Sequence, residues 1–292
     1  MSELRFDAMG SPVHVIVIGD ERLLTAARRR VEDLEAKWSR FLPSSELSRL
    51  NGAGSGVVSS DTVLLVERAV QGWRATGGRF DPTVLDALVA HGYDRSFEAV
   101  TDRPRADETH AAPGCDGIVI AEGPGVVVLP AGVHLDPGGI GKGLAADIVV
   151  EELIAGGAAG ALVSIGGDLR AEGEPPQGEA WSIAIDEPAA GGYFGTVTMT
   201  AGAVATSTTR TRRWAVGDEP VHHLIDPRIG RPSSGEVMLT TVVAAEGWWA
   251  EVATKDLMGR SPGDAGLDET AALVVVTDGR VVLVGGMEAY LS

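Results

Sequence analysis

One glycine-rich loop, residues 138–142, constrains the fold of this chain more than any other stretch, because it carries a lysine into a predicted helix at 140–154. Glycines let a ligand approach the backbone closely, and the N-terminus of a helix attracts anions. A lysine at that end is electrostatically unfavourable unless an anion binds there. Lys142 therefore favours a phosphate-binding loop, with a plain connection from loop to helix as the alternative.

The residues around this loop do not match the two most familiar nucleotide-binding patterns. A P-loop requires glycine five positions before Gly141 and Ser or Thr after the lysine, where the chain has Asp136 and Gly143. The Rossmann fingerprint opens a βαβ unit, whereas this loop lies in mid-chain and has no G-x-G-x-x-G after a strand. A P-loop or Rossmann nucleotide-binding fold is therefore not expected.

Hydrophobic periodicity predicts an irregular succession of strands and helices. Strands are expected at 13–18, 161–165, 181–185, 196–199, 222–225 and 237–244, hairpins at 117–129 and 272–284, and helices at 24–38, 63–75, 140–154 and 248–258. The strands and helices do not alternate as in a doubly wound sheet, so the predicted fold class is α+β.

The composition limits the partners and the location. The chain has 24 Lys and Arg against 41 Asp and Glu, a net charge of −17, which argues against nucleic acid or an anionic membrane as the main partner. The single cysteine, Cys115, excludes an internal disulfide and is expected to be an ordinary packed or surface thiol. The apolar stretch at 13–18 is too short for a leader or a membrane span, so we expect a cytoplasmic protein.

Eight motifs in a fixed order resemble the FAD:protein FMN transferases, the ApbE-type flavin transferases. They are MGS (9–11), FLPSSELSRLN (41–51), GGRFDPTV (77–84), LDPGGIGKGLAAD (135–147), SIGGDLRAEG (164–173), WSIAIDEP (181–188), AVATSTTR (203–210) and HHLIDPRIGRP (222–232). Because these motifs extend over nearly the whole chain, the resemblance implies a single large ApbE-type, T-fold-like domain over residues 1–292. Its sheets would be mixed and mainly antiparallel, with packed helices.

The resemblance implies an enzyme that cleaves the FAD pyrophosphate, attaches FMN through a phosphoester bond to a Thr or Ser of a target flavoprotein, and releases AMP. Family targets carry a short acceptor segment similar to Asp-Gly-x-Ser/Thr-Gly-Ala-Thr. FAD, that flavoprotein and Mg²⁺ are thus the expected substrate, partner and metal. Two alternatives use the same fold: an FAD-binding protein without transfer, and an FAD pyrophosphatase in which water replaces the target hydroxyl.

The resemblance also implies roles for individual residues. The predicted catalytic residues are Lys142, His223 and Asp226. The predicted cofactor-binding residues are Met9, Phe41, Asp81, Gly138, Gly139, Lys142, Gly166, Gly167, Asp168, Thr206 and Ser207. A histidine can take the proton of the incoming hydroxyl, and a nearby carboxylate can orient it or act as base. Core packing is the alternative for Met9 and Phe41, a strand bridge for Asp81, and a turn cap for Asp226.

The chain departs from the family pattern in the helix that should bind the metal. That helix usually reads Ala-Asp-Ala-x-x-Thr, whose Asp and Thr bind Mg²⁺ together with a backbone carbonyl of the glycine loop, near Gly141 here. This chain has Glu251 and Lys255 at the two side-chain positions. The Glu251 carboxylate is an acceptable Mg²⁺ ligand, whereas a charged lysine is not. A glutamate and a lysine four positions apart are also a common ion pair on the surface of helices. Two hypotheses follow. Either the Lys255 ammonium replaces Mg²⁺, or Glu251, Gly141 and the FAD phosphates bind Mg²⁺ with lower affinity than the usual family site.

Overall fold

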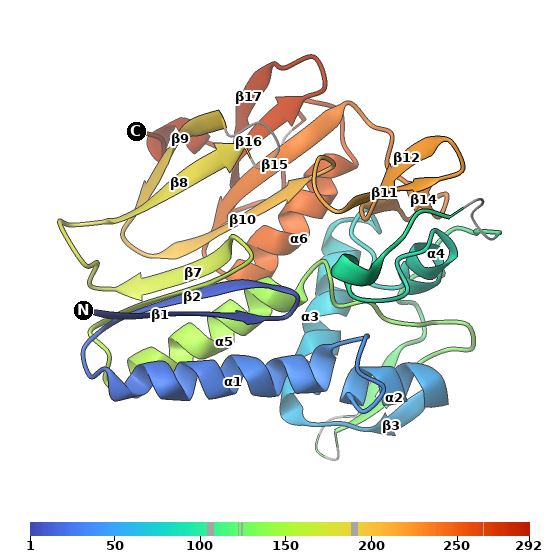
Figure 1. Cartoon of the computed structure of the whole chain (residues 1–292), viewed down its shortest axis with the longest axis horizontal. Helices are drawn as coiled ribbons and strands as arrows, with labels where there is room; N and C mark the ends of the chain where they lie inside the picture. Colours follow the sequence, from blue (N-terminus) through green and yellow to red (C-terminus); the bar gives the residue numbers. More distant parts are fainter. Residues whose placement is uncertain (104–107, 122, 124, 188–191, 265) are drawn as a thin grey trace. The chain divides into compact units, whose positions relative to one another are not determined.

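The computed structural model describes residues 1–103, 108–121, 123, 125–187, 192–264 and 266–292 (Figure 1). The chain divides into two compact units. The first unit comprises Met1–Asp33, Lys142–Thr211 and Gly235–Ser292, and the second comprises Leu34–Gly141 and Arg212–Ser234. The expectation of one domain over residues 1–292 stays a prediction.

An eight-stranded sheet organises the first unit (Figure 1). Its order is β1-β2-β6-β7-β10-β15-β16-β17, and every neighbouring pair is antiparallel. The strands are β1 (Ser2–Ala8), β2 (Ser11–Ile18), β6 (Gly160–Ile165), β7 (Asp168–Gly173), β10 (Gly202–Thr208), β15 (Val237–Ala244), β16 (Ala271–Val276) and β17 (Val281–Val284). All residues of β15 and β16 are buried, because both faces of the sheet are covered there. The α+β prediction with mainly antiparallel sheets is confirmed.

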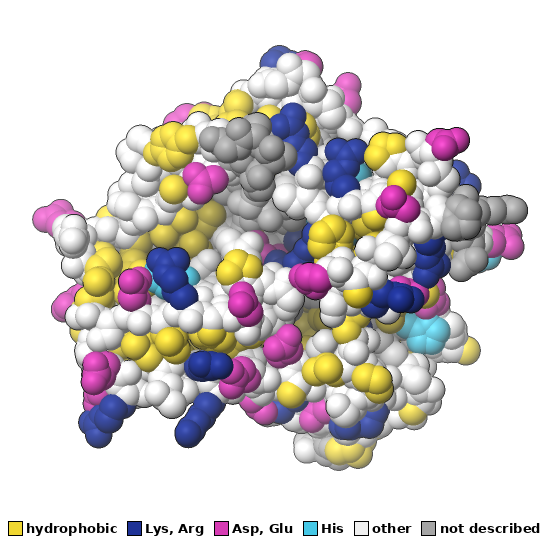
Figure 2. All heavy atoms as spheres, in the orientation of Figure 1, with side chains coloured by type: hydrophobic (Ala, Val, Ile, Leu, Met, Phe, Trp, Pro, Cys, Tyr) yellow, Lys and Arg dark blue, Asp and Glu magenta, His cyan; other side chains and the backbone are white. Residues whose placement is uncertain are grey.

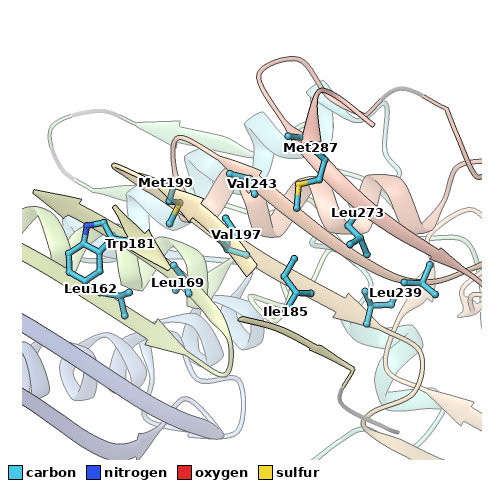
Figure 3. Packing of buried hydrophobic residues seen from close by; sticks show 14 of the residues in the cluster. Leu162, Leu169, Trp181, Ile185, Val197, Met199, Leu239, Val243, Leu273 and Met287 are labelled. Carbon is cyan, nitrogen blue, oxygen red and sulfur yellow. The ribbon is translucent and has the colours of Figure 1, made fainter. Parts of the chain in front are cut away.

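One face of this sheet packs against a hairpin of β8 (Trp181–Glu187) and β9 (Gly192–Met199) and against the 3₁₀ turn η2 (Met287–Ala289). Figure 3 shows the side chains that meet there. They are Trp181, Ile185, Val197 and Met199 from the hairpin, Leu162, Leu169, Leu239, Val243 and Leu273 from the sheet, and Met287. Each fully buried apolar side chain of this size stabilises the fold by about 1.5–3 kcal/mol.

Two helices of the first unit matter for the site. Helix α6 (Gly247–Met258) packs on β10 and β15, and α5 (Gly141–Ala155) begins at the glycine-rich loop. α5 is buried all round over residues 143–150, which explains why that part of its sequence is apolar rather than amphipathic. Helix α1 (Arg22–Trp38) starts in the first unit and ends in the second.

The second unit contains shorter elements. They are α2 (Glu46–Ala53), α3 (Ser60–Ala75), α4 (Leu85–Ala90), the 3₁₀ turn η1 (Phe97–Ala99), the sheet β3 (Ser55–Val57), β5 (Val126–Val128) and β4 (Val119–Ala121), and the ribbons β11 (Arg213–Val216) with β12 (Glu219–His222) and β13 (Ile225–Asp226) with β14 (Arg231–Pro232). Cys115 is buried in the apolar cluster of α2, α3 and β5, where burial raises the pKa of its thiol, as expected for a packed cysteine.

The four predicted helices are confirmed, but one predicted strand is wrong. β12 ends at His222 and β13 begins at Ile225, so the strand expected at 222–225 is interrupted. The His222 ring causes the break, because Nδ1 accepts from the Leu224 amide at 3.2 Å and Nε2 donates to the Ser233 carbonyl at 3.0 Å. The hairpin of β4 and β5 is confirmed, although its turn residues Glu122 and Pro124 lie outside the described residues, as does Pro188 of the 181–188 motif.

The surface carries charges of both signs. Figure 2 shows Lys and Arg side chains interspersed with Asp and Glu on the face it presents. Among the described residues, no helix combines the length and apolarity that a membrane crossing requires.

Candidate active site

Four charged side chains of the first unit meet between α5, β7 and α6. Lys142 is the second residue of α5, Asp168 is the first residue of β7, and Glu251 and Lys255 are one turn apart on α6. The Lys142 ammonium hydrogen-bonds to Asp168 Oδ2, and its Nζ lies 3.2 Å from Glu251 Oε1. Lys255 Nζ lies 3.6 Å from the same Oε1. We call these four residues the charge cluster.

The two carboxylates of the charge cluster are buried and fully partnered. Asp168 is 2% exposed and Glu251 is 0% exposed, whereas both lysine side chains are 17% exposed. Asp168 Oδ1 accepts from the Thr206 amide at 3.1 Å, and Glu251 Oε2 accepts from the Gly143 amide at 2.8 Å. Buried charge is tolerated only when it is paired, so two cations and two anions stabilise one another here.

The predicted Gly166-Gly167 turn places Asp168 in the charge cluster. Both glycines have positive φ, +62° and +94°, and form the two-residue loop between β6 and β7, with Ile165 paired to Asp168. Such a hairpin loop requires positive φ at both positions, which glycine adopts without strain. A Cβ at Gly166 would lie 2.7 Å from Ser11 Oγ, so this glycine also permits close packing.

Helices α5 and α6 cross at a pair of glycines next to the charge cluster. A Cβ on Gly143 would lie 2.2 Å from the carbonyl oxygen of Gly247, so the crossing requires glycine. Across it, Asp147 of α5 accepts from the Gly247 amide at 2.6 Å and the Trp248 amide at 2.9 Å. Each helix thus supplies a carboxylate to the other's N-terminus, Asp147 to α6 and Glu251 to α5. Burial raises the pKa of Asp147 to about 7, although these amides lower it.

Burial also changes the pKa of the Lys255 ammonium. It lowers the pKa of Lys255, while the carboxylates of Glu251 and Asp168 raise it and the Lys142 charge lowers it further. Desolvation disfavours the charged amine, and nearby anions favour it. The protonation of Lys255 therefore responds to any further anion that binds beside it.

The two predicted hydroxyl residues, Thr206 and Ser207, bond within the protein. Thr206 Oγ1 lies 2.9 Å from Thr241 Oγ1 on the neighbouring strand. Ser207 Oγ donates to Thr254 Oγ1 at 2.7 Å, because the Thr254 hydroxyl itself donates to the Glu251 carbonyl. These bonds tie β10 to α6 beside the charge cluster, and direct contact of both hydroxyls with a ligand stays a prediction.

The amides of the glycine-rich loop are mostly engaged by protein oxygens, which the sequence analysis did not anticipate. Gly138 N donates to Asp136 Oδ1 at 2.5 Å, and Ile140 N and Gly141 N donate to the Pro137 carbonyl at 3.1 and 2.7 Å. A Cβ at Gly138 would lie 2.7 Å from Asp136 Oδ1, so glycine is needed for this turn itself. Ligand contacts by Gly138 and Gly139 stay predictions, and the side chain of Lys142 is the stronger candidate for phosphate.

In the second unit, Phe41 lies beneath an arginine that the sequence analysis missed. The Arg40 guanidinium lies 4.2 Å from the Phe41 ring centroid and 4.6 Å from that of Tyr93, and Arg40 Nε lies 3.0 Å from Asp136 Oδ2. Phe41 also packs on the apolar cluster of Tyr93 and Trp214. Core packing, the alternative interpretation of Phe41, therefore applies to part of its ring.

The predicted carboxylates Asp81 and Asp226 bond to residues two positions away. Asp81 is buried, and its Oδ1 accepts from the amide and hydroxyl of Thr83 at 2.8 and 2.6 Å; burial raises its pKa. Asp226 accepts from the Arg228 amide at 3.0 Å and pairs with its guanidinium at 2.7 Å, which lowers the pKa of Asp226. The turn-cap role expected for Asp226 is confirmed, while the ligand role of Asp81 and the catalytic role of Asp226 stay predictions.

Two further predicted residues lie in connections. His223 is half-buried in the bend between β12 and β13. Met9 and Gly10 form the loop between β1 and β2, with φ of +54° and +61°. A positive φ is unusual for a long side chain and often marks a functional position, which is consistent with the ligand role predicted for Met9.

Solved structures of known proteins share the fold described above. A crystal structure of the ApbE protein from Thermotoga maritima matches with a TM-score of 0.88 and 23% identity, over 100% of this chain and 99% of that one. The flavin transferase ApbE from Vibrio cholerae matches with a TM-score of 0.80 and 23% identity, over 99% of each chain.

The sequence comparisons define the family. The model of the ApbE family matches residues 9–271, and the chain therefore belongs to the ApbE family. A relative from Klebsiella pneumoniae (strain 342) is 32% identical over 87% of this chain and 76% of its own length. One from Haemophilus influenzae is 27% identical over 91% of this chain and 81% of its own length. Both relatives are named FAD:protein FMN transferase.

Proposed function

We propose that this protein is an FAD:protein FMN transferase, an enzyme that moves FMN from FAD to a Thr or Ser of a target flavoprotein and releases AMP. The observation that carries the proposal is Lys142, held at the start of α5 by the buried carboxylates of Asp168 and Glu251 within an ApbE-family fold. The names of the relatives support the same activity.

The reaction exchanges the phosphoanhydride bond of FAD for a phosphoester bond to the acceptor. The acceptor hydroxyl oxygen bonds to the phosphorus that carries FMN, the P–O bond to the AMP phosphate breaks, and AMP leaves with the bridging oxygen and its electron pair. Negative charge develops on the phosphate oxygens during this step, so a fixed cation beside them lowers the barrier. We assign that role to Lys142, whose ammonium is oriented by two carboxylates before any substrate binds.

The proton of the acceptor hydroxyl requires a base, and we assign that role to His223. The proton then passes from His223 to solvent. Asp226 is tied to Arg228, so we assign it to shaping the turn after His223 rather than to proton transfer. For FAD binding, we assign Met9 and Phe41 to the flavin and Asp168 to ribose hydroxyls, since each carboxylate oxygen can accept a second bond.

The side chains predicted for Mg²⁺ do not fit that ion well. Glu251 Oε2 is engaged by the Gly143 amide, and Oε1 has two lysine ammonium groups within 3.6 Å. Among the described residues, no three His, Cys, Asp or Glu side chains are grouped as metal ligands. The proposed reaction therefore contains no step through a metal ion. From the sequence we further propose a cytoplasmic enzyme that acts on neither nucleic acid nor membranes.

The function is tested by incubating the protein with FAD and a flavoprotein fragment bearing the acceptor segment. Fluorescent flavin on the denatured fragment together with AMP in the supernatant is the expected result. FMN and AMP without a labelled fragment would identify a pyrophosphatase, and intact FAD retained by the protein would identify a binding protein. A characterised ApbE transferase serves as the positive control for the fragment.

A further inference from the structure

We propose that the Lys255 ammonium takes the place of a divalent metal ion in this protein, so that FMN transfer proceeds without Mg²⁺. The inference rests on the proposed transferase function. It departs from the metal requirement that the family resemblance implies, and it is carried by the arrangement of side chains in the charge cluster.

Lys255 is placed to present a charge to a ligand. Its Nζ lies 3.6 Å from Glu251 Oε1, too far for a hydrogen bond and close enough for an ion pair. Within the described part of the chain, Glu251 is the one side chain that pairs with this ammonium inside 4 Å. An ammonium has three N–H donors, so Lys255 keeps donors for an incoming oxygen. Its side chain is 17% exposed and therefore accessible from one direction.

The cluster leaves no electrostatic need for a divalent cation. Two ammonium groups balance the two buried carboxylates, Asp168 and Glu251, and each carboxylate oxygen already has a cation or an amide as partner. A Mg²⁺ bound to Glu251 Oε1 at about 2.1 Å would lie within about 6 Å of both ammonium nitrogens. Like charges at that separation in a buried site repel strongly. Metal binding at Glu251 would therefore require both lysines to move or to lose their protons.

A phosphate group suits the same site. Lys142 and Lys255 approach one Glu251 oxygen from separate segments, so both ammonium groups lie close to a single point. A phosphate beside them would accept hydrogen bonds from both ammonium groups. Lys255 would thus share with Lys142 the charge that develops in the transition state.

The first test measures metal binding directly, with Mn²⁺ as the probe and electron paramagnetic resonance as the readout. The full-length protein is expected to leave Mn²⁺ free, while Lys255→Thr, which removes the ammonium and adds an oxygen ligand, is expected to bind it at least about tenfold more tightly. Stoichiometric Mn²⁺ binding by the unaltered protein that is unchanged in Lys255→Thr would overturn the inference.

The second test measures transfer with and without EDTA. The unaltered protein is expected to label the fragment at the same rate in both conditions, and Lys255→Met to lose about 10²-fold in EDTA. Lys255→Arg, which keeps the charge, controls for loss of packing, and circular dichroism confirms that each variant is folded. Labelling that EDTA abolishes and Mg²⁺ restores would contradict the inference.

The two proposals fail in different ways. If no condition labels the fragment while a characterised transferase does, the proposed function is wrong, and the Mn²⁺ measurement still decides whether Lys255 excludes a metal ion. If labelling requires Mg²⁺, the function stands and the role of Lys255 is wrong.

Discussion

Site residues predicted in the two units bond over different sequence distances. In the first unit, Lys142 reaches Asp168 and Glu251, which lie 26 and 109 positions away. In the second, the predicted site residues Asp81 and Asp226 bond mainly to Thr83 and Arg228, two positions away. Long-range contacts hold charges that the chain alone would not bring together, whereas short-range contacts shape turns. We therefore propose that the first unit supplies the cation that stabilises the transferring phosphate, whereas these two carboxylates shape local turns.

The largest effect is expected from Lys142→Met. Loss of this ammonium removes the cation proposed to stabilise the transferring phosphate and leaves Asp168 without its charged partner, so transfer should fall about 10²–10³-fold. The rate of fragment labelling measures this change. Lys37→Met is the matched control, because Lys37 pairs with Asp61 in the second unit, and it should retain near-normal transfer. Equal rates for both variants would contradict the assignment of Lys142.

The next effect concerns the helix crossing that positions the charge cluster. In Gly143→Ala the new Cβ would lie 2.2 Å from the Gly247 carbonyl oxygen, so α5 and α6 must separate, at a cost of about 3 kcal/mol in the free energy of unfolding. Urea denaturation measures it. Gly52→Ala in α2 is the control, since its Cβ meets nothing within 4 Å and should stabilise by about 0.5 kcal/mol.

A smaller effect is expected from pH at Asp147. Burial raises the pKa of Asp147 to about 7, whereas the unfolded carboxyl titrates near 4, so the folded state binds the extra proton between these values. Stability contributed by this group is therefore lost as pH rises. The free energy of unfolding of the unaltered protein relative to Asp147→Asn should fall by about 2 kcal/mol between pH 5 and pH 6.5. A difference that stays constant, or rises with pH, would show that the amides of Gly247 and Trp248 outweigh burial.

The smallest effect is expected from Asp226→Asn. The substitution removes the ion pair with Arg228 but keeps an oxygen for the Arg228 amide, so the turn should lose only about 1 kcal/mol. Transfer should fall less than tenfold, because Asp226 is assigned to shaping the turn. Steady-state labelling and thermal unfolding measure the two quantities. A loss of transfer as large as that of Lys142→Met would place Asp226 in proton transfer instead.

Much of the fold follows from local patterns in the sequence. The helices expected at 24–38, 63–75, 140–154 and 248–258 are present, because apolar spacing reports which side of a helix is buried. The strand expected at 222–225 fails because the His222 ring bonds to the Leu224 amide, a contact that no hydrophobic pattern reports. Arg40 was missed for a similar reason, since its partner Asp136 lies far along the chain.

The sequence by itself determined the family, the α+β class and the unusual pairing of Glu251 with Lys255 four positions on. By sequence alone that pair is also the common solvent-exposed pair of a surface helix. Only the tertiary structure showed that Glu251 is fully buried and that Lys142 shares its oxygen. Likewise, only the structure showed that the Gly138 amide donates a hydrogen bond to Asp136. The physical reason is that periodicity is a local property, whereas the burial of a charge depends on which distant segments pack around it.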